Sequence, residues 1–355
     1  MQTRLFGEGL SYDHEPAFPS TRFQGSKLKI VDWIWEYVKD MEFDTALDAF
    51  GGTGSVAYLL KQKGKTVTYN DDLKFNWHIG KALIENSGVR LSKDDIDLIL
   101  SEHQDMKYPL FIQDTFKGIY YTDDENRWLD IVTSNINLIG DEYKKALAYF
   151  ALFQACIIKR PFNLFHRNNL YVRTSDVKRS FGNKVTWDTP FEEHYLKFVE
   201  EANRAVFSNC RRNKAINCDV FDIEGSFDLV YIDTPYVSSK GVGVDYFGFY
   251  HFLEGLVNYD KWGEMIDNSS RHKRLKRKES VWTDKNRINA AFEKLFEKFQ
   301  DSIIVVSYRS DGIPSINELK SMMKKHKGDV IELERKSYKY VLSNNNSEEV
   351  LLIGK

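Results

Sequence analysis

The chain has 355 residues, of which 42% are hydrophobic and 29% are charged, and its formal net charge is −2. These values are typical of a soluble globular protein with enough chain for one large domain or two of ordinary size. The small net charge does not exclude nucleic-acid binding, because phosphate contacts need only a local basic face.

The cysteines exclude two classes of stabilised fold. Cys156, Cys210 and Cys218 are far apart and share no metal-ligand spacing, which argues against a disulfide framework or a zinc site and favours a reducing compartment. The first residues contain no apolar segment typical of a secretion signal, and no apolar run approaches the length of a membrane span. We therefore expect a cytoplasmic protein with no bound metal and no membrane association.

The predicted elements begin with an irregular arm over residues 1–20. A helix is expected over residues 26–39, with Ser26 as its N-terminal cap. The following β–turn–α–β unit has its strand, glycine turn, helix and second strand at residues 45–50, 51–55, 56–64 and 65–71. Gly64 ends this helix, and the unit predicts a parallel α/β sheet.

The middle of the chain has a different pattern. Residues 75–158 are mostly helical, most clearly at 141–159, whereas residues 160–190 are rich in Asn, Arg, Lys and turn residues. A helix resumes over residues 191–208. Strands are then expected at 215–221, 227–237 and 302–310, a helix at 285–300, and two strands in the tail, KYVLSN and EVLLIGK.

The glycine turn is a candidate cofactor site. Asp48 and Phe50 precede Gly52 and Gly54, whose backbone can pass close to a ligand at the N-terminus of the next helix. Asp71 ends the second strand, where a carboxylate can accept both hydroxyls of a ribose. The spacing Gly52-x-Gly54-x-x-Ala57 also fits a dinucleotide fingerprint, so a nicotinamide-dependent oxidoreductase remains an alternative, as does a tight turn that binds no ligand.

An upstream element favours a different cofactor. Gly25 permits close approach to a ligand beside Phe23, and Lys27, placed just inside the expected helix, can pair with a ligand carboxylate. S-adenosylmethionine carries an α-carboxylate and NAD does not. Taken by itself, Lys27 is better interpreted as an ordinary solvated helix lysine, and only its combination with the other elements favours the cofactor role.

The segment Asp233-Thr234-Pro235-Tyr236 follows an apolar strand, at the end where open α/β folds place ligands. The amino nitrogen of adenine is a poor nucleophile because its lone pair is delocalised into the ring. The Asp233 side chain and the Thr234 carbonyl can accept its two hydrogens and favour a more reactive, pyramidal nitrogen. Pro235 fixes the turn, and Tyr236 can stack on an extruded base.

A sulfonium methyl donor would make this chemistry mainly a matter of positioning. Asp219, which is expected to end the preceding strand, could accept a hydrogen bond from the adenine amine of such a cofactor. Asp222 competes with Asp219 for that role. An ordinary Asp-Thr-Pro turn remains the alternative interpretation of the Asp233 segment.

These elements, in this order, resemble the D12 class of adenine-specific DNA methyltransferases, the Dam-like group. The matching segments are TRFQGSK (21–27), LDAFGGTGSV (47–56), YNDD (69–72) and YIDTPYV (231–237). The resemblance implies that Phe23, Lys27, Asp71 and Asp233 contact the cofactor, with the turn at Phe50, Gly52 and Gly54 around its methionine part. The family usually has proline where this chain has Thr234, which does not remove the backbone carbonyl.

The resemblance implies an α/β fold, with a Rossmann-like S-adenosylmethionine-dependent methyltransferase sheet and an inserted, mainly helical DNA target-recognition domain. The catalytic domain would comprise residues 1–76 and 196–355, and the inserted domain residues 77–195. The implied activity is methylation of the N6 amino group of adenine in a short motif of double-stranded DNA, in a restriction–modification setting that can include a cognate endonuclease. A related methyltransferase acting on RNA or on a protein amide is the alternative.

Two basic stretches are expected to contact DNA, cations through phosphates and amides through base edges. An ordinary solvated surface is the alternative for both. The residues of the first are Arg160, Asn163, Arg167, Asn168, Asn169, Arg173, Lys178, Arg179 and Lys184. Those of the second are Arg271, Lys273 and Arg274.

Overall fold

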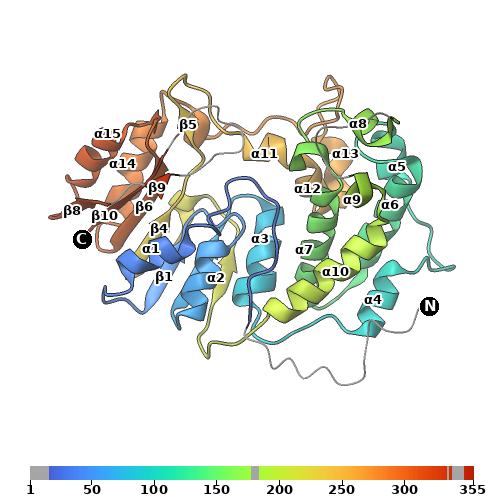
Figure 1. Cartoon of the computed structure of the whole chain (residues 1–355), viewed down its shortest axis with the longest axis horizontal. Helices are drawn as coiled ribbons and strands as arrows, with labels where there is room; N and C mark the ends of the chain where they lie inside the picture. The colour runs from blue at the N-terminus through green and yellow to red at the C-terminus, as the bar shows by residue number, and fades with distance from the viewer. Residues whose placement is uncertain (1–15, 177–183, 334–335, 338–347) are drawn as a thin grey trace.

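The computed structural model describes residues 16–176, 184–333, 336–337 and 348–355. Its centre is a sheet with the order β3-β2-β1-β4-β6-β10-β8, seen from the side in Figure 1. The bounds are β1 Thr45–Asp48, β2 Thr66–Asn70, β3 Lys214–Ile216, β4 Leu229–Ile232, β6 Ile303–Arg309, β8 Val330–Glu332 and β10 Glu348–Gly354. The strands from β3 to β6 in this order are parallel. The predicted α/β sheet is therefore confirmed, and it has the Rossmann-like arrangement.

Strand β10 departs from the expected parallel pattern. It inserts between β6 and β8 and runs antiparallel to both. The short strand β9 (Lys336–Ser337) pairs with its first residues. A separate two-stranded sheet joins β5 (Val237–Ser238) to β7 (Gly312–Ile313). Because β10 is reversed, its first residues lie at the same edge of the sheet as the carboxyl ends of the parallel strands.

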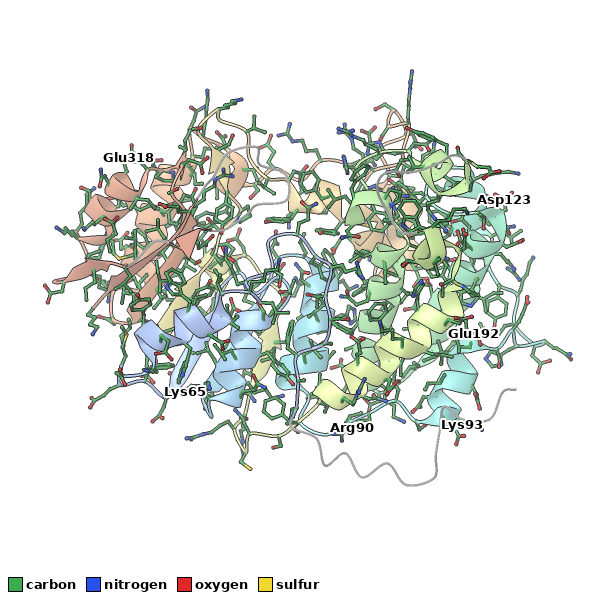
Figure 2. All side chains as sticks on the ribbon, in the orientation of Figure 1. Lys65, Arg90, Lys93, Asp123, Glu192 and Glu318 are labelled. Atoms are coloured by element: carbon green, nitrogen blue, oxygen red, sulfur yellow. The ribbon has the colours of Figure 1, made fainter. Side chains whose placement is uncertain are left out.

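Two apolar layers cover the sheet, because neighbouring residues of a strand point to opposite faces. Ala46 of β1 belongs to one buried cluster and Leu47 to the other. The first face carries α1 (Val31–Val38), α2 (Ser55–Gln62) and α3 (Lys74–Gly80), and the second carries α14 (Ile288–Lys298) and α15 (Ile316–Met323). Charged residues such as Glu318 lie at the periphery (Figure 2).

A helical part extends from α3 through a π-helical segment, Lys81–Glu85. Its helices are α4 Lys93–Leu100, α5 Phe111–Thr115, α6 Asp123–Leu138, α7 Glu142–Ile158, α8 Leu170–Thr174, α9 Lys184–Asp188 and α10 Phe191–Ala205. Asp141 caps α7, and Thr122 with Glu125 forms a capping box at α6. From Ala146 onward α7 is buried on all sides, so it forms the centre of this part.

Residues beyond the Asp233–Tyr236 segment also join the helical part. The chain returns as α11 (Tyr246–Phe249), α12 (His251–Leu256) and α13 (Trp262–Met265). Phe252 of α12 packs against Phe116, with ring centroids 5.0 Å apart. The helical part is thus built from two stretches of chain, whereas the boundaries 77–195 for an inserted domain remain a prediction.

Several local predictions need correction. Helix α1 begins at Val31 after Ile30, which provides no side-chain cap. Ser26 is therefore not a helix cap, and Lys27 lies before the helix. The strand expected at 215–221 ends at Ile216 and gives way to a 3-10 turn at Val220–Asp222. The tail segment KYVLSN lies outside the described residues. No helix in the described ranges is long and apolar enough to cross a membrane.

Candidate active site

A cavity of about 680 Å³ lies at the carboxyl ends of β1, β2 and β4, within the usual size range of small-molecule sites. The sheet reverses its order between β1 and β4, because β1 continues to β2 on one side and β4 to β6 on the other. Open α/β sheets bind ligands at this point. The cavity brings together predicted site residues from separate parts of the sequence: Phe23, Gly25, Lys27, Asp48, Phe50, Gly52, Asp71, Asp219, Asp233, Thr234 and Pro235.

The glycine turn is shaped by Tyr69 beneath it. The Tyr69 ring is fully buried, and its hydroxyl donates to the carbonyls of Gly52 and Asn76 at 2.7 and 3.0 Å. A β-carbon on Gly51 would lie 2.0 Å from this ring. Gly54, the N-cap residue just before α2, has a φ of 76°, a conformation that favours glycine. The turn is therefore held close to the sheet, with its backbone exposed to the cavity.

Two carboxylates flank this turn. Asp71 accepts hydrogen bonds from the backbone of Gly52 and Leu73, both at 2.9 Å. Burial nonetheless raises the pKa of Asp71 to about 6. Burial, together with the nearby charge of Asp233, raises the pKa of Asp48 to about 8. Asp48 accepts one bond, from the amide of Ala57 at 3.2 Å. A ligand cation beside Asp48 would offset this cost of ionisation.

Lys27 joins a buried polar network at the end of β4. Its ammonium lies 3.1 Å from Asp233 Oδ1 and 2.8 Å from Glu349 Oε1, and it donates to the Tyr236 hydroxyl. That hydroxyl lies 2.8 Å from Asp233 Oδ1. Burial raises the pKa of Asp233 to about 6, against the opposing effect of Lys27. Lys27 is thus paired with Asp233 and Glu349. The sequence predicted a pairing with a ligand carboxylate and neither of these partners.

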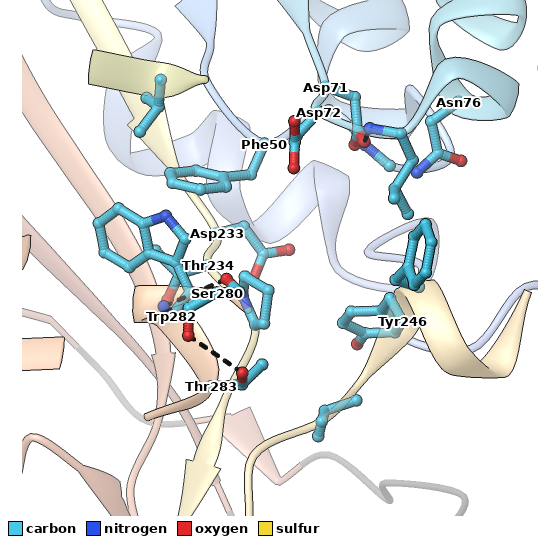
Figure 3. Close-up of a pocket in the computed structure, with 18 of the residues that line it drawn as sticks. Phe50, Asp71, Asp72, Asn76, Asp233, Thr234, Tyr246, Ser280, Trp282 and Thr283 are labelled. Atoms are coloured by element: carbon cyan, nitrogen blue, oxygen red, sulfur yellow. Dashed lines mark hydrogen bonds between the residues drawn. The ribbon is translucent and has the colours of Figure 1, made fainter. Parts of the chain in front are cut away.

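The position of Tyr236 does not support the predicted stacking on a base. Its ring is buried and packs edge-on against Tyr308, with centroids 5.2 Å apart. Tyr236 is also absent from the residues that line the cavity. Tyr246 of α11 lines the cavity instead, across from Asp233 (Figure 3). The sequence does not distinguish these two tyrosines, because both lie in apolar segments near the same turn.

Three aromatic rings form another wall, of which only Phe50 was predicted from the sequence and Phe221 and Trp282 were not. The Trp282 ring meets Phe50 edge-on at 5.0 Å and stacks on Phe221 at 5.7 Å, as Figure 3 shows for Phe50 and Trp282. A tryptophan directly after a strongly charged run was the available signal. Asp219 lines the cavity beside Phe221 whereas Asp222 does not, which favours Asp219 of the two candidates. Asp219 reaches the cavity from the turn after β3, because this strand already ends at Ile216.

Four cavity-lining residues carry buried polar atoms without a hydrogen-bond partner among the described residues: Gln24 Nε2, Asp48 Oδ1, Tyr231 Oη and Thr234 Oγ1. Unsatisfied buried polar atoms are rare because each costs free energy. Their position in one cavity is consistent with a polar ligand that supplies the missing partners.

Comparisons with known proteins agree with this geometry. A sequence profile described as D12 class N6 adenine-specific DNA methyltransferase matches residues 23–312. The chain belongs to this family. The enzyme is therefore a DNA methyltransferase that acts on adenine. The family match does not support the alternatives, which were a nicotinamide-dependent oxidoreductase and a methyltransferase acting on RNA or on a protein amide.

Curated relatives carry matching names. The chain is 28% identical to Type II methyltransferase M2.HphI of Haemophilus parahaemolyticus, across 95% of this chain and 96% of that protein. It is 25% identical to Modification methylase LlaI of Lactococcus lactis subsp. lactis, across 92% of this chain and 52% of the relative. It is 27% identical to Type II methyltransferase M.FokI of Planomicrobium okeanokoites, across 86% of this chain and 47% of the relative. The chain thus spans nearly all of the first relative and about half of the other two.

Some residues expected to meet DNA are buried in this methyltransferase. Arg160 is 1% exposed and donates to the carbonyls of Leu164, Tyr120 and Arg167 and to Asn169. Its guanidinium also lies over the Tyr120 ring. The prediction that Arg160 and Asn169 contact DNA is therefore wrong for this conformation, in which both hold the loop after α7 in place.

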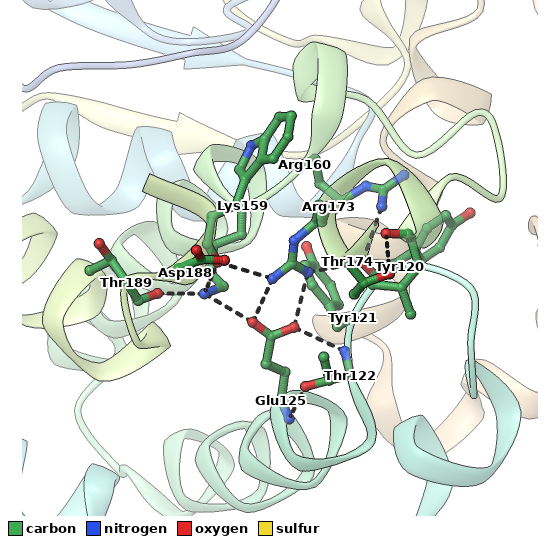
Figure 4. A network of polar contacts seen from close by, with 12 residues as sticks. Tyr120, Tyr121, Thr122, Glu125, Lys159, Arg160, Arg173, Thr174, Asp188 and Thr189 are labelled. Carbon is green, nitrogen blue, oxygen red and sulfur yellow. Dashed lines mark hydrogen bonds and ion pairs between the residues drawn. The ribbon is translucent and has the colours of Figure 1, made fainter. Parts of the chain in front are cut away.

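Arg173 is likewise buried. It pairs with Glu125 through two nitrogens, at 2.9 and 2.6 Å, and Lys159 reaches the same carboxylate at 2.9 Å. These charges hold the pKa of Glu125 below its usual value, against the effect of burial. Figure 4 shows the three side chains converging between α6, α7 and α8. Arg173 thus stabilises the helical part instead of reaching a phosphate.

The remaining predicted DNA contacts lie at the surface or outside the described residues. Arg167, Asn168, Lys184, Arg271 and Arg274 are exposed, and Asn163 and Lys273 are half-buried. Lys184 pairs with Asp188, and Arg274 with Asp267. Lys178 and Arg179 fall outside the described residues. The exposed residues keep their predicted role, which no contact with a nucleic acid yet tests.

Proposed function

We propose that the cavity binds S-adenosylmethionine and that the Asp233–Tyr236 segment presents the adenine amine to its methyl group. The observation that carries this proposal is the convergence of Lys27, Asp48, Asp71 and Asp233 on one cavity at the switch point of the sheet. Membership of a DNA adenine methyltransferase family supplies the acceptor. The same cavity must therefore receive both the donor and the extruded base.

The cofactor roles follow from the walls of the cavity. Asp71, at the end of β2, would accept ribose hydroxyls, and Asp219 would accept from the adenine amine beside the Phe221–Trp282 wall. The turn at Gly52 and Gly54 would hold the methionine part. Asp48 Oδ1, buried and without a partner among the described residues, would accept the α-ammonium group. Each role matches a donor or cation of the cofactor to an acceptor of the chain.

The acceptor chemistry depends on Asp233 and Thr234. Bound S-adenosylmethionine supplies an electrophilic sulfonium methyl group. The Asp233 carboxylate and the Thr234 carbonyl would accept hydrogen bonds from the adenine amine, which aligns its lone pair for in-line attack. Positive charge develops on this nitrogen, and an ionised Asp233 stabilises it. With a pKa of about 6, Asp233 is ionised above that pH. Tyr246, on the wall across from Asp233, is our candidate for stacking on the base.

The first of the two stretches that build the helical part, the predicted residues 77–195, is the proposed target-recognition region. Its exposed residues Arg167, Asn168 and Lys184 and the half-buried Asn163 would contact double-stranded DNA. Arg271, Lys273 and Arg274, from the loop before Trp282, would contact it as well. The similarity to two Type II methyltransferases supports a place in restriction–modification, with a cognate endonuclease as a further expectation.

Mass spectrometry of nucleosides tests this proposal. Duplex DNA incubated with the protein and S-adenosylmethionine should yield N6-methyladenine, and Asp233→Ala should abolish it while cofactor binding persists. Asp301→Asn, which neutralises an exposed carboxylate, is the matched control and should retain full activity. Undiminished methylation by Asp233→Ala would exclude the proposed catalytic role, and methylation of RNA alone would exclude the proposed substrate.

A further inference from the structure

Glu349 occupies a position that the established activity does not explain. It is a fully buried carboxylate on β10 and lies outside the residues 23–312 that match the family. Its Oε1 atom lies 2.8 Å from the Lys27 ammonium and 3.2 Å from the Tyr236 hydroxyl. The Ser307 hydroxyl donates to the same oxygen at 2.5 Å. Burying a carboxylate is costly unless it is paired and hydrogen-bonded, and Lys27, Tyr236 and Ser307 supply these partners to Glu349.

The topology explains how Glu349 reaches the site. Strand β10 runs antiparallel to β6, with Glu349 opposite Arg309. The start of β10 therefore lies at the carboxyl edge of β4 and β6, where Asp233 follows β4. Because strand residues alternate between faces, Glu349 and its neighbour Glu348 point to opposite sides of the sheet. The antiparallel insertion thus brings one additional carboxylate to the catalytic edge.

The charge balance indicates what this carboxylate does. Lys27 lies between Asp233 Oδ1 and Glu349 Oε1, so one buried ammonium is shared by two carboxylates. With Glu349 neutral, the full positive charge of Lys27 would compensate Asp233 alone. An Asp233 neutralised in this way would stabilise less of the positive charge that develops on the adenine amine, since electrostatic effects are strong in a water-excluded site.

We propose that Glu349 is a positioning residue that shares Lys27 with Asp233, so that Asp233 keeps negative charge available for the adenine amine. This inference rests on the proposed function of Asp233. Glu349 acts through Lys27 and Tyr236 and does not itself touch the base. Its negative charge also raises the pKa of Asp233, so its removal has a consequence that lost packing would not produce.

Glu349→Gln tests the inference, with Glu348→Gln as the matched control on the same strand. Single-turnover methyl transfer to duplex DNA is measured from pH 5 to 8, together with the affinity for S-adenosylmethionine and the melting temperature. Glu349→Gln should lower the maximal methyl-transfer rate by about tenfold or more. It should also move the acid limb of the pH–rate profile, where the rate falls as Asp233 is protonated, to lower pH, because Asp233 loses a neighbouring like charge. Glu348→Gln should match the wild type in both respects.

The outcomes separate the two levels of the argument. An unchanged rate and limb in Glu349→Gln would overturn the inference while wild-type methylation upholds the proposed function. A lowered rate with an unmoved limb would also overturn it, because it would show a purely structural role. A wild type that does not methylate DNA would overturn both. If Glu349→Gln fails to fold, Glu349→Asp should keep the limb in place, and a displaced limb there would refute the charge-sharing argument.

Discussion

Asp48 predicts that cofactor binding depends on pH in a defined direction. Its carboxyl has a pKa of about 8 in the ligand-free chain because it is buried and lies near Asp233. At pH 7 it is then about nine-tenths protonated, and ionising it costs about 1.4 kcal/mol. If the α-ammonium of S-adenosylmethionine pairs with the ionised form, binding must release this proton.

The direction and size of the pH dependence of cofactor affinity follow from proton linkage. A group that loses its proton on binding makes the affinity rise with pH, up to the pKa of the free state. Between pH 6 and pH 7 the dissociation constant should therefore fall nearly tenfold, to about one-ninth of its value. Binding at pH 7 should release about 0.9 proton. Both effects diminish above pH 8, where the free carboxyl is already ionised.

Isothermal titration calorimetry measures both quantities when it is repeated in buffers of different ionisation enthalpy. Asp48→Asn is the matched variant, because the amide oxygen can still accept from Ala57. Asp48→Asn should remove the additional proton release and flatten the pH dependence of the affinity. The variant should still fold, because it replaces a buried ionisable group with a neutral one. The reasoning would be refuted if wild-type binding released no more protons than Asp48→Asn does.

Three further predictions follow from the geometry. Gly51→Ala should destabilise the protein by about 1–3 kcal/mol in thermal unfolding and weaken cofactor binding, since its β-carbon meets the buried Tyr69 ring; unchanged stability would contradict the tight turn. Arg173→Ala should lower the free energy of unfolding by about 3 kcal/mol, because it leaves Glu125 without its bidentate partner. Arg271→Ala should leave this free energy unchanged and reduce the slope of log K for DNA binding against log salt by about one. The reverse pattern would refute the assignment of Arg173 to the fold and of Arg271 to DNA. Tyr246→Ala should lower kcat/KM for DNA about tenfold and leave the cofactor affinity unchanged. The same loss in Tyr246→Phe would contradict stacking, because it would show that the hydroxyl and not the ring is responsible.

The cofactor half of the site could be predicted from sequence because its determinants are local. Asp48, the glycines of the turn and Asp71 lie within one β–turn–α–β unit, whose strand lengths and turn residues fix their relative positions. Parallel strands then place Asp233 at the same edge. Lys27 was found through its motif, although its observed partners were not.

The remainder depends on contacts between distant segments. Arg160 and Arg173 lie in a stretch that looks like an exposed basic loop, and only the fold brings Glu125 and the carbonyl of Tyr120 to them. Periodicity can show that Glu349 belongs to a strand but not that this strand inserts antiparallel beside β6. Tyr236 is buried against Tyr308 and Tyr246 lines the cavity for reasons of packing, which adjacent sequence does not encode.

A crystal structure with S-adenosylhomocysteine and a duplex containing the target adenine tests the central claim most directly. The account predicts that the ligand ribose lies at Asp71, its ammonium group at Asp48, and its sulfur opposite an extruded adenine whose amine contacts Asp233 and the Thr234 carbonyl. A ligand bound elsewhere, or an adenine amine that contacts neither group, would contradict the account.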